Sequence, residues 1–190
     1  KTEQWYRRSG NEGDVVISTR VRLARNLSTT PFPASMTVEQ KEEVVQKAAE
    51  ALQAETEYGP FELIHMAGLP QREALAMVER HLISPEFCRC DEGSALLLSG
   101  DESISVMVNE EDHFRLQVMR PGLDLDGAFA AADGLDTVLD SRLHFAFDDR
   151  LGYLTQCPTN LGTGMRASIM LHLPALQEKG MLQQLANTVA

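Results

Sequence analysis

Long apolar runs, basic residues and cysteines are all scarce in this 190-residue sequence. No apolar stretch approaches the roughly 18–20 residues that span a bilayer, and the first residues lack a signal-peptide pattern, so we expect a cytoplasmic protein with no membrane anchor. Lysine and arginine together number 17 against 28 acidic residues, a formal net charge of −11. Because binding to a nucleic-acid backbone needs a basic surface, this balance argues against nucleic acid as a main partner.

Metal-binding and nucleotide-binding signatures are also missing. Three cysteines in a chain without a secretory signal argue against a disulfide framework. Cys88 and Cys90 form a lone Cys-x-Cys, but no further Cys or His pair follows at zinc-site spacing, so we expect no resident metal. The sequence lacks the P-loop motif, Gly-x-Gly-x-x-Gly, His-Arg-Asp and Asp-Phe-Gly. If ATP is a ligand, arginines must bind its phosphates in place of a P-loop lysine.

The order of apolar patterns predicts one α+β domain with a largely antiparallel sheet. Residues 1–13 are expected to form an N-terminal arm docked by Trp5 and Tyr6, and residues 14–190 the domain itself, without repeats or linkers. Strands are expected from Asp14, at 61–66, 95–98, 103–108 and 114–119, up to Thr155, and at 168–173.

Four helices are expected, at 37–54, 70–82, 126–145 and from 174 to the end of the chain. Thr37 and Gln40 predict a capping box at the start of the first helix. Pro70 is suited to the first turn of the second. The residues expected to face inward are Val44, Val45, Ala48 and Leu52 in the first helix, Leu75, Val78 and Leu82 in the second, and Leu135, Leu139 and Leu143 in the third.

Two arginines alternate along the first expected strand. Ser18, Arg20 and Arg22 project from one face, because successive side chains of a strand point to opposite sides. A guanidinium group matches phosphate oxygens bidentately, so this row is suited to a polyphosphate. On this segment alone, a solvated strand face with ordinary surface arginines is the simpler interpretation. The opposite face is core-like, with Ile17, Thr19, Val21 and Leu23.

An acidic run, Asn109–Arg115, interrupts the strand pattern between apolar flanks. Such a run is usually an exposed turn. Glu111 and Arg115 are an even number of residues apart, so they share a face if the segment is extended. A carboxylate beside a phosphate-binding arginine can position a cationic nucleophile and accept its proton. The histidines His65, His113, His144 and His172 lie in helix-like or strand-like stretches and are interpreted as structural.

Residues 150–167 form the most unusual stretch, with a proline, several glycines and one thiol. We expect a loop that places Cys157 and a buried Arg166 on one rim, with free backbone N–H groups between them, as in phosphate-binding nests. Thr155, Thr159 and Arg166 are candidates to stabilise a thiolate. A tight structural connection with an inert cysteine remains the alternative.

Three ordered motifs together resemble those of the ATP:guanidino phosphotransferases, the phosphagen kinase family: Ser18–Arg22, Asn109–Arg115 and Cys157–Arg166. Other stretches are most similar to the bacterial branch that phosphorylates arginine side chains of proteins: Arg22–Asn26, His81–Pro85, Arg150–Thr155 and Arg166–Pro174. The similarity runs from about Trp5 to the C-terminus.

This resemblance implies a glutamine-synthetase-like catalytic domain, an antiparallel sheet flanked by helices. It implies ATP as phosphoryl donor, with Mg²⁺ held mainly through the nucleotide phosphates. Glu111 is expected to orient the acceptor guanidinium and take its proton, Cys157 to lie beside it as a thiolate, and Arg166 to complete the catalytic set. The nucleotide-binding residues implied are Ser18, Arg20, Arg22, His81, Arg115 and Arg166.

The family pattern departs from this sequence at both ends. The small-molecule kinases carry a helical domain ahead of the arginine strand, which helps to enclose the free substrate. In this sequence only a short arm precedes that strand. The site is therefore expected to be open, which fits an arginine carried by a protein. The family's Arg-Gly-x-x-Gly-Glu loop would follow Ala190, so we expect a catalytic domain that is incomplete at its C-terminus. Met170 stands where the creatine and arginine kinases have a nucleotide-site histidine, so adenine contacts are expected to differ.

The implied function is transfer of the ATP γ-phosphoryl group to arginine side chains of proteins, marking them for Clp proteolysis. McsA, ClpC and CtsR are the partners that the resemblance implies, and a homodimer is compatible with it. Two alternatives stay open: a kinase of free arginine or another small guanidino compound, and an inactive nucleotide- or protein-binding module.

Overall fold

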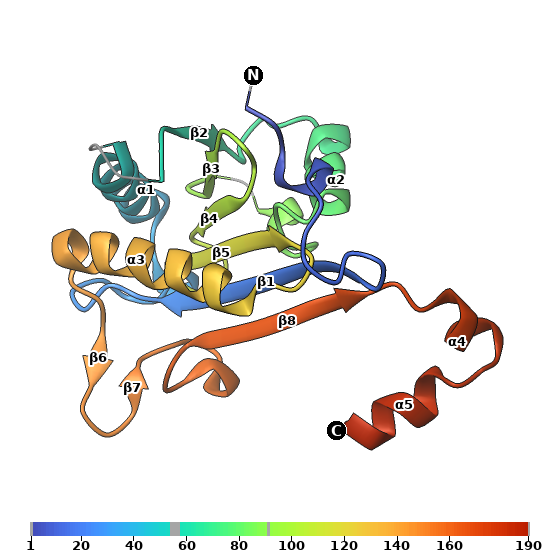
Figure 1. Cartoon of the computed structure of the whole chain (residues 1–190). Coiled ribbons are helices and arrows are strands. Elements are labelled where there is room, and N and C mark those ends of the chain that lie inside the picture. The colour runs from blue at the N-terminus through green and yellow to red at the C-terminus, as the bar shows by residue number, and fades with distance from the viewer. Residues whose placement is uncertain (1, 54–57, 91, 190) are drawn as a thin grey trace.

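The computed structural model describes residues 2–53, 58–90 and 92–189, and within them a six-stranded sheet forms the centre of the molecule (Figure 1). The strand order is β2-β3-β4-β5-β1-β8, and each neighbouring pair is antiparallel. The strands are β1 (Val16–Arg25), β2 (Phe61–His65), β3 (Ala95–Ser99), β4 (Ile104–Val108), β5 (Phe114–Pro121) and β8 (Met165–Leu171), with a separate hairpin of β6 (Phe147–Asp148) and β7 (Gly152–Tyr153). The predicted α+β class with an antiparallel sheet is confirmed.

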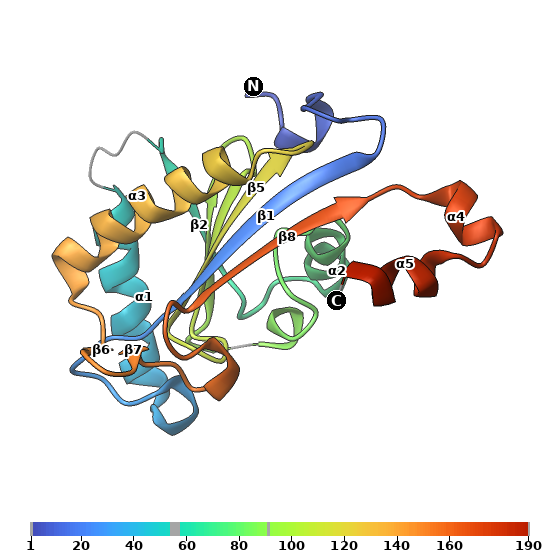
Figure 2. The same cartoon turned by 60° about the horizontal axis from the view of Figure 1, so that its bottom comes forward.

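Helices cover the two faces of this sheet unequally. The α-helices are α1 (Val38–Gln53), α2 (Gln71–Glu79), α3 (Leu125–Leu143), α4 (Pro174–Glu178) and α5 (Leu182–Val189). Figure 2 shows α1 and α3 on one side of the sheet and α2 on the other, while α4 lies beyond the end of β8 and α5 turns back from it. Over the described residues, no helix combines the length and the apolar character of a membrane span.

The main hydrophobic core lies between the sheet and the pair α1 and α3. Val21, Leu116 and Leu135 are among its almost fully buried members. Burying one such side chain contributes about 1.5–3 kcal/mol. A second, smaller core under α2 includes Leu96 and Met107 from the opposite face of β3 and β4. The face opposite α1 and α3 is therefore apolar under α2 but polar along β5, β1 and β8.

The start of α1 agrees with its sequence signature. The Gln40 side-chain oxygen accepts from the Thr37 backbone N–H at 2.9 Å, and the Gln40 N–H donates back to the Thr37 hydroxyl at 3.3 Å. This confirms the capping box, which satisfies two amide groups that the first turn leaves without helical partners. The four residues predicted to face inward on this helix are buried. The predicted helix end at Ala54 lies outside the described residues.

Two predicted packing details and one predicted helix end are wrong. Ile17 is 48% exposed, because the pairing of β1 with β8 shifts register between Val16 and Ser18 at the strand end. In α2, Leu75 is 50% exposed, and Ala74 and Met77 are buried instead. The predicted helix end at Leu82 is also wrong, since the helix ends at Glu79, but Leu82 is fully buried, as predicted.

The last expected helix is divided in two. Gly180 adopts φ +67° between α4 and α5, a conformation that ends a helix and that glycine adopts without strain. A continuous helix from Pro174 to the end of the chain was therefore a wrong prediction.

The first described residues pack against the end of the sheet. Trp5 is buried in a short 3₁₀ turn, and its backbone N–H donates to the Asp101 carbonyl at 3.0 Å. Tyr6 contacts the Trp5 ring edge-on at 5.7 Å but is itself 41% exposed. Docking of the arm thus depends on one of the two predicted aromatic residues. The boundary between arm and domain at residues 13 and 14 stays a prediction.

Candidate active site

One face of β5, β1 and β8 carries a set of converging arginines, here called the arginine face. Antiparallel register places Arg22 opposite Arg166 on β8, and Arg115 on β5 opposite Ala24, two residues along β1 from Arg22. Arg20 lies opposite Ser168 and Met119. Cross-strand partners share a face, so alternation within each strand brings these side chains together. The row predicted from the first strand alone is one part of a larger surface.

Burial and the neighbouring positive charges raise the energy of the charged forms of Arg20 and Arg22. Burial lowers the pKa of Arg22 to about 10, and the positive charges of Arg20, Arg115 and Arg166 add to the effect. Burial and the charge of Arg115 also lower the pKa of Arg20. A bound polyanion would relieve this repulsion, so the arginine face has the electrostatic character of a phosphate site.

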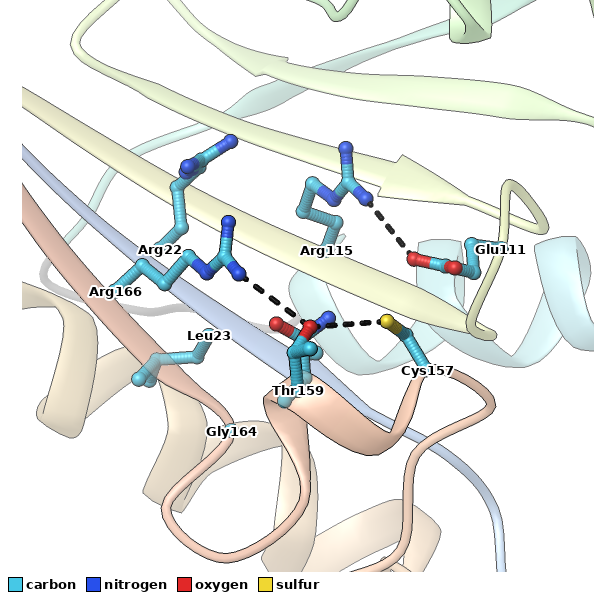
Figure 3. Close-up of a pocket in the computed structure, with 10 residues that line it drawn as sticks. Arg22, Leu23, Glu111, Arg115, Cys157, Thr159, Gly164 and Arg166 are labelled. Atoms are coloured by element: carbon cyan, nitrogen blue, oxygen red, sulfur yellow. Dashed lines mark hydrogen bonds and ion pairs between the residues drawn. The ribbon is translucent and has the colours of Figure 1, made fainter.

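A pocket of about 120 Å³ lies between the arginine face and the loop that follows β7. Figure 3 shows Arg22, Arg115 and Arg166 on one side of it, with Glu111 and Cys157 at the other end. Its lining residues are Arg22, Leu23, Ala24, Glu111, Arg115, Cys157, Thr159, Asn160, Gly164 and Arg166. The structure therefore brings together all three predicted catalytic residues.

Two further cavities continue the pocket along the sheet. One, of about 380 Å³, is lined by Arg20, Arg22 and Arg115 together with His81. The other, of about 160 Å³, is lined by Ser18, Arg20 and His81, with Met170 opposite. Neighbouring cavities share lining residues, so the three lie side by side from Cys157 to His81, and together they are here called the trough. Each residue predicted to bind nucleotide lines this trough.

His81 is held at the trough by its backbone. It adopts φ +60°, and its carbonyl accepts from the Gln117 side-chain amide at 2.7 Å. The imidazole itself is exposed. This arrangement leaves the ring free to contact a ligand in the trough.

The carboxylate of Glu111 faces the pocket beside Arg115. Its Oε2 lies 3.6 Å from the Arg115 Nη2, and its side chain is 38% exposed. The two side chains therefore share a face, as predicted. An exposed carboxylate next to an anion-binding guanidinium is suited to hold a cationic acceptor and to accept a proton from it.

Glu110 contacts a predicted site residue, Arg115, and the sequence analysis did not identify it. Its Oε2 lies 2.9 Å from Arg115 Nη1, and its Oε1 accepts from the Ser84 hydroxyl at 2.6 Å. Burial raises the pKa of Glu110, although Arg115 opposes the shift. Arg115 is thus held between two carboxylates. Asn109 at φ +60° turns the backbone here, so strand alternation could not predict which way Glu110 points.

The thiol is joined to the arginine face through a hydroxyl. Cys157 Sγ lies 3.0 Å from Thr159 Oγ1, and Arg166 Nη2 donates to the same oxygen at 3.4 Å. Thr155 does not serve the sulfur, because its hydroxyl donates to the Cys157 carbonyl at 2.9 Å. Arg166 is exposed, not buried as predicted, because β8 is the outermost strand of the sheet.

Asp112 connects the acidic run to the loop that carries the thiol. Its Oδ1 accepts from the Asn26 side-chain amide at 2.7 Å and from the Gln156 backbone N–H at 2.8 Å. Asp112 is buried, so these bonds are shielded from water. The segments of Glu111 and Cys157 are thereby fixed relative to each other.

Among the residues described, no three His, Cys, Asp or Glu side chains form a group suited to a metal ion.

Comparisons with known proteins agree with this geometry. Residues 42–190 match the family model described as ATP:guanido phosphotransferase, C-terminal catalytic domain. The protein-arginine kinase of Halothermothrix orenii is 46% identical over 188 residues, which cover 98% of this chain and 53% of that protein. The protein-arginine kinase of Brevibacillus brevis is 48% identical over 174 residues, which cover 90% of this chain and 49% of that protein.

Solved structures give the same fold. The substrate-free duplicated taurocyamine kinase of Schistosoma mansoni is 29% identical with a TM-score of 0.77, covering 87% of this chain and 25% of that chain. Lombricine kinase, 21% identical with a TM-score of 0.75, covers 91% of this chain and 52% of its own and supports the fold alone. The present chain spans about half the length of the curated relatives it matches. From the family match and these relatives, the chain belongs to the ATP:guanidino phosphotransferases, and its residues 42–190 match the catalytic domain of that family.

Proposed function

We propose that this chain carries the reacting groups of a protein arginine kinase of the McsB type, which transfers the γ-phosphoryl group of ATP to arginine side chains of proteins. The observation that supports it most is one pocket in which Arg22, Arg115 and Arg166 face Glu111 and Cys157. The 46% identity to a protein-arginine kinase supports a protein-borne acceptor. This chain spans about half the length of that relative, so its kinase activity is proposed by likeness to a longer protein.

In the proposed mechanism the arginine face holds the triphosphate, and Ser18 and His81 hold the nucleoside end of the trough. Mg²⁺ would enter with the nucleotide, held mainly through its phosphates, and would neutralise phosphate charge. The arginines stabilise the charge that spreads over the transferred group in the transition state. Four guanidinium groups along one trough suit a triphosphate better than a single phosphate.

The acceptor guanidinium enters between Glu111 and Cys157. One of its nitrogens forms a bond to the γ-phosphorus while the bond from that phosphorus to the β–γ bridging oxygen breaks, and ADP leaves. Glu111 takes the proton lost by the attacking nitrogen. The Cys157 thiolate, stabilised by the Thr159 hydroxyl at 3.0 Å, balances the positive charge of the acceptor.

The cellular role is a further part of the proposal. By family resemblance, phosphorylation marks proteins for Clp proteolysis in the cytoplasm, with McsA, ClpC and CtsR as partners and a homodimer as the assembly. A kinase of a small guanidino compound is the alternative favoured by the 29% identity to taurocyamine kinase. An inactive nucleotide- or protein-binding module is the third candidate, and the assay below separates it from the two kinases.

The test offers Mg-ATP with an arginine-rich protein in one tube and with free arginine in another. Product is scored as acid-labile phosphate, because phosphorylated guanidines hydrolyse in acid and phosphoserine does not. We expect labile label on the protein only, and none with Glu111→Gln. Label on free arginine would instead support the metabolite kinase. ATP binding without label in either tube would support the inactive module.

A further inference from the structure

Arg25, at the end of β1, is a buried charge that the proposed mechanism does not use. Its side chain is 4% exposed and points to the face opposite the arginine face, where it meets α3. Nε and Nη2 donate to the two carboxylate oxygens of Asp136, each at 2.9 Å. This bidentate pair fixes the plane of the guanidinium group.

The remaining surface of that guanidinium contacts the end of residues 154–164, here called the thiol loop, and the residue that precedes this loop. Nη1 donates to the Thr163 carbonyl at 3.0 Å, at the end of the loop. The guanidinium carbon lies 3.4 Å from the centroid of the Tyr153 ring, just before the loop begins. Stacking on an aromatic ring and a hydrogen bond to a carbonyl use different parts of the group, so Arg25 makes both contacts at once.

The base of the thiol loop is closed directly over Arg25. The Tyr153 backbone N–H donates to the Gly162 carbonyl at 2.8 Å, and the Ala24 N–H donates to the Gly164 carbonyl at 2.8 Å. A side-chain carbon at Gly164 would lie 2.6 Å from Arg25 Nη1. The loop therefore rests on this guanidinium without intervening side chains.

We propose that Arg25 is a positioning residue that holds the thiol loop in register with the arginine face. It acts through the loop. Arg25 contacts Thr163 and Tyr153 and fixes their positions. These two residues in turn keep Cys157, Thr159 and the following Arg166 facing the pocket. The pocket is lined from both sides of this contact, by Arg22 on β1 and by Thr159 on the loop. The consequence for catalysis rests on the proposed function, whereas the placement of the loop does not.

The test substitutes Arg25→Lys, which keeps the positive charge beside Asp136 but loses the planar fork and most of the stacking. The readout is the rate of Cys157 alkylation by iodoacetamide across pH 6–9, resolved from Cys88 and Cys90 by peptide mass spectrometry. We expect the rate at pH 7 to fall roughly tenfold, because the sulfur loses its fixed position beside the Thr159 hydroxyl and Arg166. Where phosphoryl transfer is measurable, kcat/KM for the acceptor should fall between about 10-fold and 100-fold.

The control is Arg142→Lys. Arg142 lies on α3, and its Nη1 donates to the Ala51 carbonyl at 2.9 Å, away from the thiol loop. It should leave alkylation unchanged. If Arg25→Lys fails to fold, Tyr153→Leu removes the stacked ring, and Tyr153→Phe restores it. Alkylation should be slowed by Tyr153→Leu and not by Tyr153→Phe.

A lower unfolding temperature with an unchanged alkylation profile in both Arg25→Lys and Tyr153→Leu would overturn the proposal, because Arg25 would then be structural only. Alkylation requires no phosphoryl transfer. If the variants change the pH profile of Cys157 alkylation while the unsubstituted protein has no kinase activity, the positioning role of Arg25 is supported. Only the proposed function is then contradicted.

Discussion

Glu111 and Arg166 line one pocket but serve different ligands in the proposed mechanism, which allows substitution to separate them. Glu111→Gln should abolish phosphoryl transfer and leave Mg-ATP affinity nearly unchanged, since the carboxylate serves the acceptor. Arg166→Ala should weaken nucleotide binding first. Calorimetric titration of Mg-ATP beside a transfer assay measures both effects. Equal loss of ATP affinity in the two variants would show that Glu111 has the wrong role here.

His113 gives a pH dependence that follows from its hydrogen bonds. Nδ1 accepts from the Leu27 backbone N–H at 3.0 Å, and Nε2 lies 2.8 Å from the Pro31 carbonyl, which requires the neutral ring with its proton on Nε2. Burial lowers the pKa of His113 below its ordinary value of 6.5, although the Pro31 bond and Asp112 oppose the shift. A second proton on Nδ1 would face the Leu27 N–H.

The unfolded chain therefore binds a proton near pH 6.5 that the folded protein resists. The contribution of His113 to stability should be complete above pH 6.5 and should decrease as the pH falls below it, by at most about 1.4 kcal/mol per pH unit. Urea unfolding between pH 5 and 8 measures this slope. His113→Gln should unfold with a shallower slope over that interval. Identical slopes in the two proteins would contradict the assignment.

At the scale of elements, the thiol loop depends on a glycine that admits close backbone approach. Gly164 adopts φ +61°, and a side-chain carbon there would lie 2.6 Å from the Ala24 carbonyl oxygen. Gly164→Ala should cost about 1–3 kcal/mol and slow Cys157 alkylation. Gly180→Ala is the control, because Gly180 has a similar φ of +67° with no atom within 4 Å of the added carbon. Urea unfolding measures the loss of stability in each variant. Similar losses in the two would show that the positive φ alone accounts for the cost, and that the close backbone approach at Gly164 does not contribute.

Elements with a local signature could be predicted from the sequence. The capping box of Thr37 and Gln40 and the alternation of Arg20 and Arg22 depend on near neighbours in the chain, and both are confirmed. Leu75 and Arg166 were misjudged because their burial depends on which element packs over them. Glu110 could not be assigned because the positive φ of Asn109 sets the direction of its side chain, and Arg25 could not because its partner Asp136 lies 111 residues away.

At the scale of the whole molecule, the strands of the sheet differ strongly in how far they are buried. Every residue of β3 and β4 is buried, whereas every residue of β8 is exposed. Hydrogen exchange should be slowest in β3 and β4 and fast in α4, in α5 and at the β8 amides that point away from β1. Mg-ATP should slow exchange in β8 and the thiol loop. Uniform protection, or slowing confined to α1, would contradict this picture.

The central claim is that the arginine face binds the triphosphate with its γ-phosphate directed to Glu111 and Cys157. The most direct test is a crystal structure with Mg²⁺ and a non-hydrolysable ATP analogue. We expect phosphate oxygens within hydrogen-bond distance of Arg20, Arg22, Arg115 and Arg166, and the γ-phosphate at the pocket end of the trough. A triphosphate bound elsewhere, such as in the cavity lined by Lys47 and Arg142, would contradict the account.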